Sequence, residues 1–167
     1  MDVSILKERR CIARPLSDNF RKMEHHIVPE FSPFNAVVAV GIALCYISLF
    51  SLVKMPLRRT LNALVIAGAG ATYLSGGFGP WEFSICFPMM FLAYKGLSDV
   101  RFIGLGWLLH TVWDLAHHWY GNPIVPFDPS SSAGCAVCDT VLAIWFFGNA
   151  PSVFNLLGKT QPANQLS

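Results

Sequence analysis

The feature that most constrains this chain is a run of about twenty residues, 34–53, that contains no charged side chain. A helix of that length matches the hydrocarbon core of a bilayer, which is about 30 Å thick. Four more apolar runs follow it, at 61–78, 81–94, 102–119 and 136–154. The pattern predicts an all-α integral membrane protein, a bundle of about five transmembrane helices.

The composition favours the same class of protein. Of the 167 residues, 53% are hydrophobic and only 13% are charged, whereas about a quarter of the residues of an ordinary soluble domain are charged. The expected partner is therefore the lipid bilayer. A net charge of +2, without a basic run interleaved with aromatic residues, argues against nucleic acid. We expect one transmembrane domain, 34–155, between polar tails at 1–33 and 156–167.

The lysines and arginines in the short turns predict the orientation. The turn at 54–59 carries three and the turn at 95–101 carries two. Because short cytoplasmic loops are rich in these residues, both turns should face the cytoplasm. Five spans then place the connector 120–135 on the non-cytoplasmic side, and the multi-pass chain ends on the cytoplasmic side.

The fourth apolar run carries four ionisable residues, His110, Asp114, His117 and His118. At about 100° per residue they point at roughly 0°, 40°, −20° and 80°, so they share one helical face. Ionisable groups at membrane depth are costly and usually face a partner or a cavity. We therefore expect the functional site here.

These residue types suit a divalent metal such as zinc or iron, or acid–base catalysis. The candidate metal ligands are His110, Asp114, His117, His118 and Asp128. About 10.5 Å of helix rise separates residues seven apart, so one ion would rarely take all the ligands of one helix. Other residues would have to complete the site, and Asp128, Cys135, Cys138, Asp139 and Glu82 are available. The alternative is structural: His110 and Asp114 form a buried pair between helices, and His117 and His118 lie in an aromatic belt at the membrane interface.

Cys135 and Cys138 form a Cys-x-x-Cys pair directly before Asp139, at the predicted start of the fifth helix. Such a pair can be redox-active, can supply a metal ligand or a catalytic thiol, or can be structural. In an oxidising compartment a disulfide would be its default state. A helix N-terminus favours the thiolate, and the neighbouring carboxylate opposes it.

One long motif runs through this region. It comprises Leu109-His-Thr-Val-Trp-Asp-Leu-Ala-His-His118 and then Gly121, Pro123-Ile124, Pro126, Ser131, Gly134-Cys135 and Cys138-Asp139. In residue types and spacings it resembles a family of small polytopic membrane proteins that is known mainly as a domain of unknown function. The resemblance covers about residues 34–155 and leaves 1–22 outside. It implies a multi-span membrane protein and no particular activity.

The leading hypothesis is a small intramembrane enzyme that acts on an apolar or lipid-like small molecule at the non-cytoplasmic interface. Its candidate catalytic residues are His110, Asp114, His117, His118, Cys135, Cys138 and Asp139. One alternative is a membrane thiol–disulfide oxidoreductase using Cys135 and Cys138, and another is a non-catalytic carrier or metal-binding accessory protein. A composite site requires Cys138 or Asp139 to lie within about 8 Å of His117 or Asp114, the scale of directly bonded or water-bridged neighbours.

Overall fold

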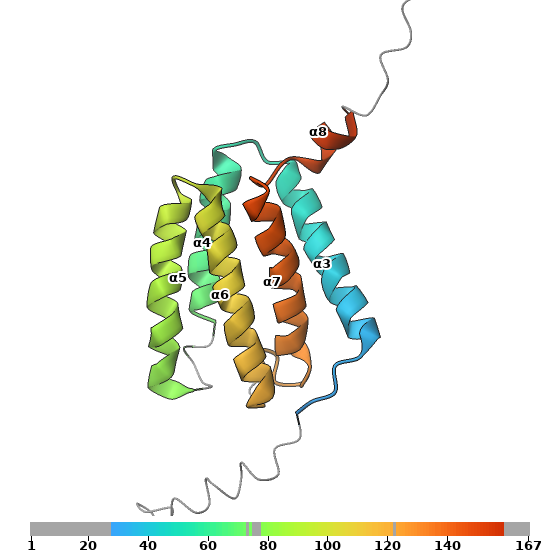
Figure 1. The fold of residues 1–167 in the computed structure, drawn as a ribbon, viewed down its shortest axis with the longest axis vertical. Helices are drawn as coiled ribbons and strands as arrows, with labels where there is room; N and C mark the ends of the chain where they lie inside the picture. The colour runs from blue at the N-terminus through green and yellow to red at the C-terminus, as the bar shows by residue number, and fades with distance from the viewer. Residues whose placement is uncertain (1–27, 73, 75–77, 122, 159–167) are drawn as a thin grey trace, which may run out of the picture.

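The chain folds into an upright bundle of helices (Figure 1). A computed structural model describes residues 28–72, 74, 78–121 and 123–158. The described residues form helices and loops with no strand, which confirms the all-α prediction. The helices are α3 (Pro33–Ser51), α4 (Leu57–Gly70), the 3₁₀ helix η2 (Gly79–Glu82), α5 (Phe83–Gly96), α6 (Val100–Trp119), α7 (Ser131–Phe147) and α8 (Val153–Gly158).

Helices α3 to α7 run up and down along the long axis, and α8 projects from one end (Figure 1). Helix α6 packs most extensively on α7 and also contacts α5 and α4. Helix α3 packs mainly against α7, so that α7 lies between α6 and α3 (Figure 1). The fourth and fifth helices of the bundle, which carry the predicted site residues, are therefore direct neighbours.

Local sequence explains where two of the long helices begin. Ser32 caps α3 by accepting a hydrogen bond from the Asn35 amide at 3.2 Å, and Pro33 occupies the first turn, where its missing N–H costs nothing. Asp99 caps α6 in the same way, accepting from the Arg101 amide at 2.9 Å. Both caps satisfy amides that the helix itself leaves without partners.

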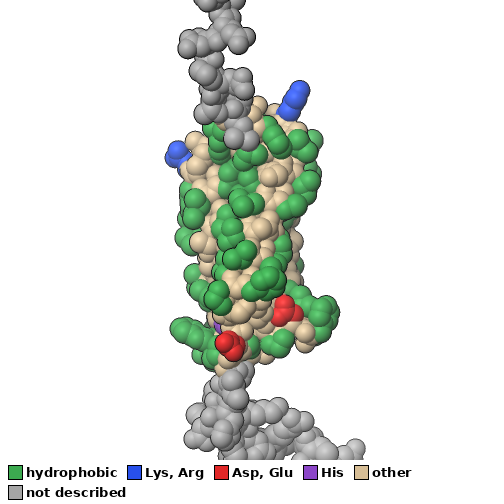
Figure 2. All heavy atoms as spheres, turned by 90° about the vertical axis from the view of Figure 1, so that its right-hand side faces the viewer, with side chains coloured by type: hydrophobic (Ala, Val, Ile, Leu, Met, Phe, Trp, Pro, Cys, Tyr) green, Lys and Arg blue, Asp and Glu red, His purple; other side chains and the backbone are tan. Residues whose placement is uncertain are grey.

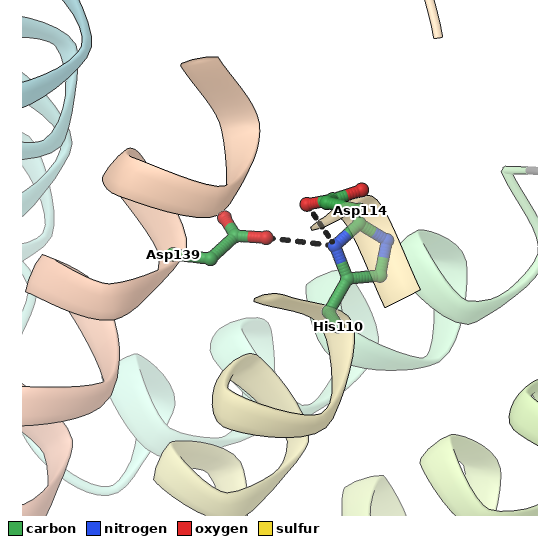
Figure 3. Close-up of side chains that lie close together, drawn as sticks. All are labelled: His110, Asp114 and Asp139. Carbon is green, nitrogen blue, oxygen red and sulfur yellow. Dashed lines mark hydrogen bonds and ion pairs between the residues drawn. The ribbon is translucent and has the colours of Figure 1, made fainter. Parts of the chain in front are cut away.

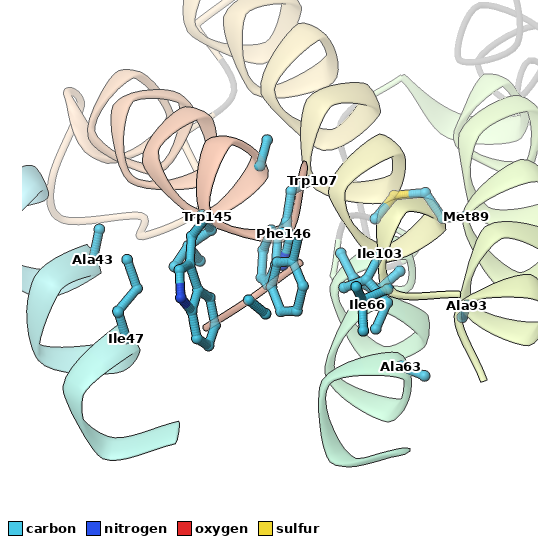
Figure 4. Close-up of a cluster of buried hydrophobic side chains, with 14 residues drawn as sticks. Ala43, Ile47, Ala63, Ile66, Met89, Ala93, Ile103, Trp107, Trp145 and Phe146 are labelled. Carbon is cyan, nitrogen blue, oxygen red and sulfur yellow. The ribbon is translucent and has the colours of Figure 1, made fainter. Parts of the chain in front are cut away.

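The apolar core occupies the half of the bundle that contains the start of α6 and the end of α7 (Figure 4). Phe146, Ile66, Met89 and Ile103 are completely or almost completely buried there. Two glycines let α6 approach its neighbours closely: a Cβ at Gly106 would lie 2.9 Å from Ile66, and one at Gly104 would lie 3.2 Å from the Ala143 carbonyl oxygen. The core thus fixes α6 against both α4 and α7.

A buried arginine joins the helix ends beyond this core. Arg58 donates from Nε to the Val53 carbonyl at 2.8 Å, from Nη1 to the Ala150 carbonyl at 2.8 Å and from Nη2 to the Ser51 carbonyl at 3.0 Å. These carbonyls follow or end α3 and α7, where a cation interacts favourably with the helix dipoles. Arg58 therefore ties the first and last helices of the bundle to α4.

The predicted boundaries were wrong for α4 and for both ends of α7, which ends at Phe147 and not at about 154. Helix α4 spans Leu57–Gly70 and not 61–78; Gly68 and Gly70 in its last turn have weak helix propensity. Helix α7 begins at Ser131, five residues before the predicted start, because only Pro123, Pro126 and Pro129 resist helix and the serines after them can enter the first turn. Residues 1–27 and 159–167 of the predicted tails, and 75–77 of a predicted helix break, lie outside the described residues.

Helix α3 is long and apolar enough to cross a membrane, and most of its surface is not buried inside the bundle. Within the described part of the chain it is the one helix that meets both conditions. The view onto the α3 side shows hydrophobic side chains between a basic end and an acidic end (Figure 2).

Candidate functional site

Three buried ionisable side chains converge between α6 and α7 (Figure 3). His110 and Asp114 lie one turn apart on α6, and Asp139 reaches them from α7. His110 Nδ1 lies 3.1 Å from Asp114 Oδ2 and 2.7 Å from Asp139 Oδ2. One ligand atom from each residue lies within 4.8 Å of the other two. We call these three residues the His110 cluster.

The second nitrogen of the imidazole determines how the cluster is protonated. His110 Nε2 lies 3.2 Å from the Ala69 carbonyl oxygen of α4. Because a carbonyl can only accept, Nε2 carries a proton, and the Nδ1 atom faces the two carboxylates. Ionised carboxylates also only accept, so the three groups need a shared proton or a cation among them.

A second buried pair lies towards the connector end of α6. His117 Nε2 lies 3.1 Å from Glu82 Oε1, and both side chains are at most 2% exposed. The Glu82 carboxylate also accepts from the Trp113 indole N–H at 2.7 Å and from the Phe78 amide at 2.8 Å. We call Glu82 and His117 the Glu82–His117 pair.

The predicted proximity of α6 and α7 residues is confirmed, because Asp139 lies within 8 Å of Asp114. The helical-face argument placed His110, Asp114, His117 and His118 on one inward face of α6. The first three are buried, and His118 is only half-buried. His117 contacts Glu82, however, and so takes part in a second buried group. Glu82, expected near the membrane interface, is buried at the junction of η2 and α5.

Two other candidates, His118 and Asp128, lie outside the cluster. His118 is half-buried and lines a groove between α6 and α7, with a volume of about 410 Å³, together with Thr111 and Ala136. Asp128 is exposed, and its Oδ1 accepts from the Ser130 amide and hydroxyl at 2.9 and 2.8 Å. The Asp128 side chain thus shapes the connector before α7 and does not join the His110 cluster.

Cys135 and Cys138 are free thiols on successive turns of α7. Both are half-buried and line a groove between α3 and α7. Asp139, the next residue along the helix, faces α6 instead (Figure 3). Helix α7 therefore presents its thiols to one neighbour and its carboxylate to the other.

The chain matches the family of unknown function DUF6010 over residues 34–152. It belongs to this family. The matched segment contains the whole His110 cluster, the Glu82–His117 pair and both thiols, and it confirms the resemblance seen in the sequence. No curated protein sequence matches the chain. No solved structure matches it either.

Sequence reasoning missed three partners of the site. The Ala69 carbonyl is a backbone group, so no residue type could have marked it. The Trp113 indole and the Phe78 amide both hold Glu82, across a turn whose geometry apolar periodicity does not reveal. A buried carboxylate beside a tryptophan N–H becomes recognisable only when α5 and α6 are placed side by side.

Proposed function

We propose that this DUF6010 protein spans the membrane with the five helices α3 to α7. Large apolar side chains are exposed on every one of these helices, among them Val37, Leu64, Phe87, Val112 and Ile144. A protein in water rarely exposes such extensive apolar surface. The two basic turns also meet at one end of the bundle, where the Arg59 guanidinium donates to the Ser98 carbonyl at 3.0 Å.

Cysteine reporters test this topology. Leu57 lies at the basic end and Phe127 in the connector at the opposite end, and Phe127 is 90% exposed. With an impermeant thiol reagent, Leu57→Cys and Phe127→Cys should be labelled from opposite sides of the membrane, after the reactivity of the native cysteines has been measured. Labelling of both from one side would contradict five spans.

We further propose that the His110 cluster binds a divalent cation, with zinc and iron as the leading candidates. The carrying observation is the convergence of one imidazole nitrogen and two carboxylates from two helices in a buried site. The separations of 2.7 and 3.1 Å from His110 Nδ1 are those of charge-assisted hydrogen bonds, whereas neighbouring ligands of a tetrahedral ion with bonds of about 2 Å lie about 3.3 Å apart. The side chains would need to separate by only a few tenths of an ångström to admit an ion in place of the proton. The Ala69 carbonyl accepts the other imidazole proton, as partners of metal-binding histidines usually do.

The function that this site supports best is an intramembrane enzyme for an apolar or lipid-like substrate. His110, Asp114 and Asp139 would hold the ion, which when bound supplies Lewis-acid chemistry and an activated water. Three protein ligands leave a coordination position open, as in catalytic zinc sites. The grooves on both sides of α7 offer a substrate routes from the lipid towards this helix.

Elemental analysis of the purified protein tests the metal site. Wild-type protein should contain about one equivalent of a divalent metal, and Asp139→Asn and His110→Ala should lose it. Glu82→Gln is the matched control, since it alters a buried carboxylate–imidazole contact outside the cluster. Wild-type protein that is purified without metal and stays metal-free after incubation with zinc, iron or manganese would overturn the proposal. The three side chains of the His110 cluster would then share a proton in place of an ion.

One observation favours a second candidate function. Two free thiols, three residues apart on one helix, line the same groove. In a membrane thiol–disulfide oxidoreductase they would exchange with a substrate disulfide, and loss of either sulfur would abolish turnover. Metal loss in Asp139→Asn with thiol-exchange activity intact would separate the two functions.

A further inference from the structure

A groove between α3 and α7 is not used by the His110 cluster. Its volume is about 310 Å³, at the lower end of the range of about 300–1,000 Å³ for small-molecule sites. Along most of its length the walls are apolar, with Phe34, Val38 and Ile42 on the α3 side. Cys135 and Cys138 line the α7 side.

One end of this groove is polar. Asn35 Nδ2 donates to the Ser130 hydroxyl oxygen at 2.9 Å, and that hydroxyl donates to Asp128 Oδ1 at 2.8 Å. These three residues join the start of α3 to the connector before α7, and all three line the groove. Asp128 is the one charged side chain among the described lining residues. The groove therefore has an apolar stem and a polar, negatively charged mouth.

A glycine keeps the α7 wall of the groove open. Gly134 lies in the first turn of α7, and a Cβ built there meets no atom within 4 Å among the described residues. The helix packing therefore does not require glycine at this position, unlike at Gly104 and Gly106. The missing side chain leaves space beside Cys135 and Cys138.

We infer that this groove binds a neutral single-chain amphiphile with a hydroxylated head, such as a monoacylglycerol. The apolar stem runs from Phe34 to Ile42 on α3, about 12 Å of helix rise, so it suits part of one acyl chain, and its volume is small for a molecule with two. Hydroxyl groups can hydrogen-bond to Asp128, Ser130 and Asn35, whereas an anionic head would be repelled by the carboxylate. The inference assigns a lipid-binding site separate from the His110 cluster, and it rests on the proposed membrane location but not on the metal.

Photo-crosslinking in phosphatidylcholine nanodiscs tests the inference. The probe is a monoacylglycerol with a diazirine in its acyl chain, and the crosslinked peptides are mapped by mass spectrometry. Crosslinks should concentrate on the α3 and α7 peptides that line the groove. Unlabelled monooleoylglycerol at about ten times its Kd should reduce them about tenfold, because the unoccupied fraction falls in proportion. Oleoyl lysophosphatidic acid, with the same chain and an anionic head, should compete much less.

Two variants separate this site from general lipid contact. Gly134→Phe should fill the groove and remove the competed crosslinks, while Gly68→Phe, at another helical glycine with open space around it, should keep them. Asp128→Asn, at an exposed position, should let lysophosphatidic acid compete as well as monooleoylglycerol.

Several results would overturn the inference. They are crosslinks spread over all lipid-facing helices, equal competition by both lipids in the wild type, or competed crosslinks that persist in Gly134→Phe. If Gly134→Phe does not fold, the lipid preference of Asp128→Asn decides alone. Crosslinking does not depend on bound metal, so a metal-free protein with the expected crosslinks would refute the metal site and leave the amphiphile site standing.

Discussion

Helix α6 carries two buried imidazole–carboxylate groups that differ in their balance of charge. In the Glu82–His117 pair one carboxylate faces one imidazole, and the Trp113 and Phe78 N–H groups also donate to that carboxylate. In the His110 cluster two carboxylates face one imidazole nitrogen. A protonated His117 balances Glu82, but a protonated His110 leaves one negative charge in the cluster. A divalent cation that replaces the proton on His110 Nδ1 would balance both carboxylates.

The two groups also suit different roles, one structural and one chemical. A carboxylate held by three donors is a rigid connection between η2, α5 and α6, and it suits a structural role. Three ionisable groups from two helices, with one ligand atom of each within 4.8 Å of the others, suit the binding of an ion. Neighbouring positions on one helical face can therefore have different roles, because their partners come from different helices.

The largest expected effect is on stability. Glu82→Ala leaves His117 without its carboxylate and the Trp113 N–H without its acceptor, so the free energy of unfolding should fall by about 3–5 kcal/mol. Asp139→Asn in chelator-treated protein should change it by less than about 1 kcal/mol, because one imidazole still faces Asp114. Denaturant titration in mixed micelles measures both. If Asp139→Asn lowers the free energy of unfolding more than Glu82→Ala does, the His110 cluster and not the Glu82–His117 pair has the structural role.

The next effect concerns metal affinity. His110→Ala should weaken zinc binding by more than about 100-fold, because losing a ligand costs more than the 10–100-fold typical of a supporting partner. His117→Ala is the matched histidine control and should retain zinc affinity in whatever fraction folds. Competition with a chelating dye of known affinity gives both constants. Similar losses in the two variants would place His117 in the metal site as well.

The thiols should matter little for the metal. Cys135→Ser and Cys138→Ser should bind zinc within about threefold of the wild type, because the thiols face the α3 groove while Asp139 faces α6. The same dye competition measures this effect. A loss of 100-fold in either variant would make that sulfur a ligand.

The smallest effect is expected at Asp128. Its carboxylate is exposed and accepts from Ser130, and asparagine can accept the same hydrogen bonds. Asp128→Asn should change the free energy of unfolding by less than about 0.5 kcal/mol. Its metal content, measured by elemental analysis, should equal that of the wild type. If Asp128→Asn loses its metal, Asp128 is a metal ligand after all.

Much of this architecture could be predicted from apolar runs and helical periodicity. The runs located the five long helices, and the angular spacing on α6 identified the buried side of His110, Asp114 and His117. The recruitment of Asp139 followed from the short connector. These inferences depend only on local geometry or on chain length, and both can be read from sequence.

The pairing of the groups could not be predicted in the same way. His117 lies about 10.5 Å along the helix from His110, so its partner depends on which helix end lies beside it. That partner is Glu82, which the short helix η2 brings into the bundle. The role of the Ala69 carbonyl likewise arises from packing and backbone geometry, which residue types do not encode.

X-ray absorption spectroscopy at the metal edge tests the central claim most directly. For wild-type protein loaded with one equivalent of zinc, the account predicts a first shell of oxygen and nitrogen at about 2.0–2.2 Å, with one imidazole. Asp139→Asn should lose this signal, and Glu82→Gln should keep it. A shell with sulfur at about 2.3 Å or with two imidazoles, or a Glu82→Gln variant without bound zinc, would contradict the assignment of the metal to the His110 cluster.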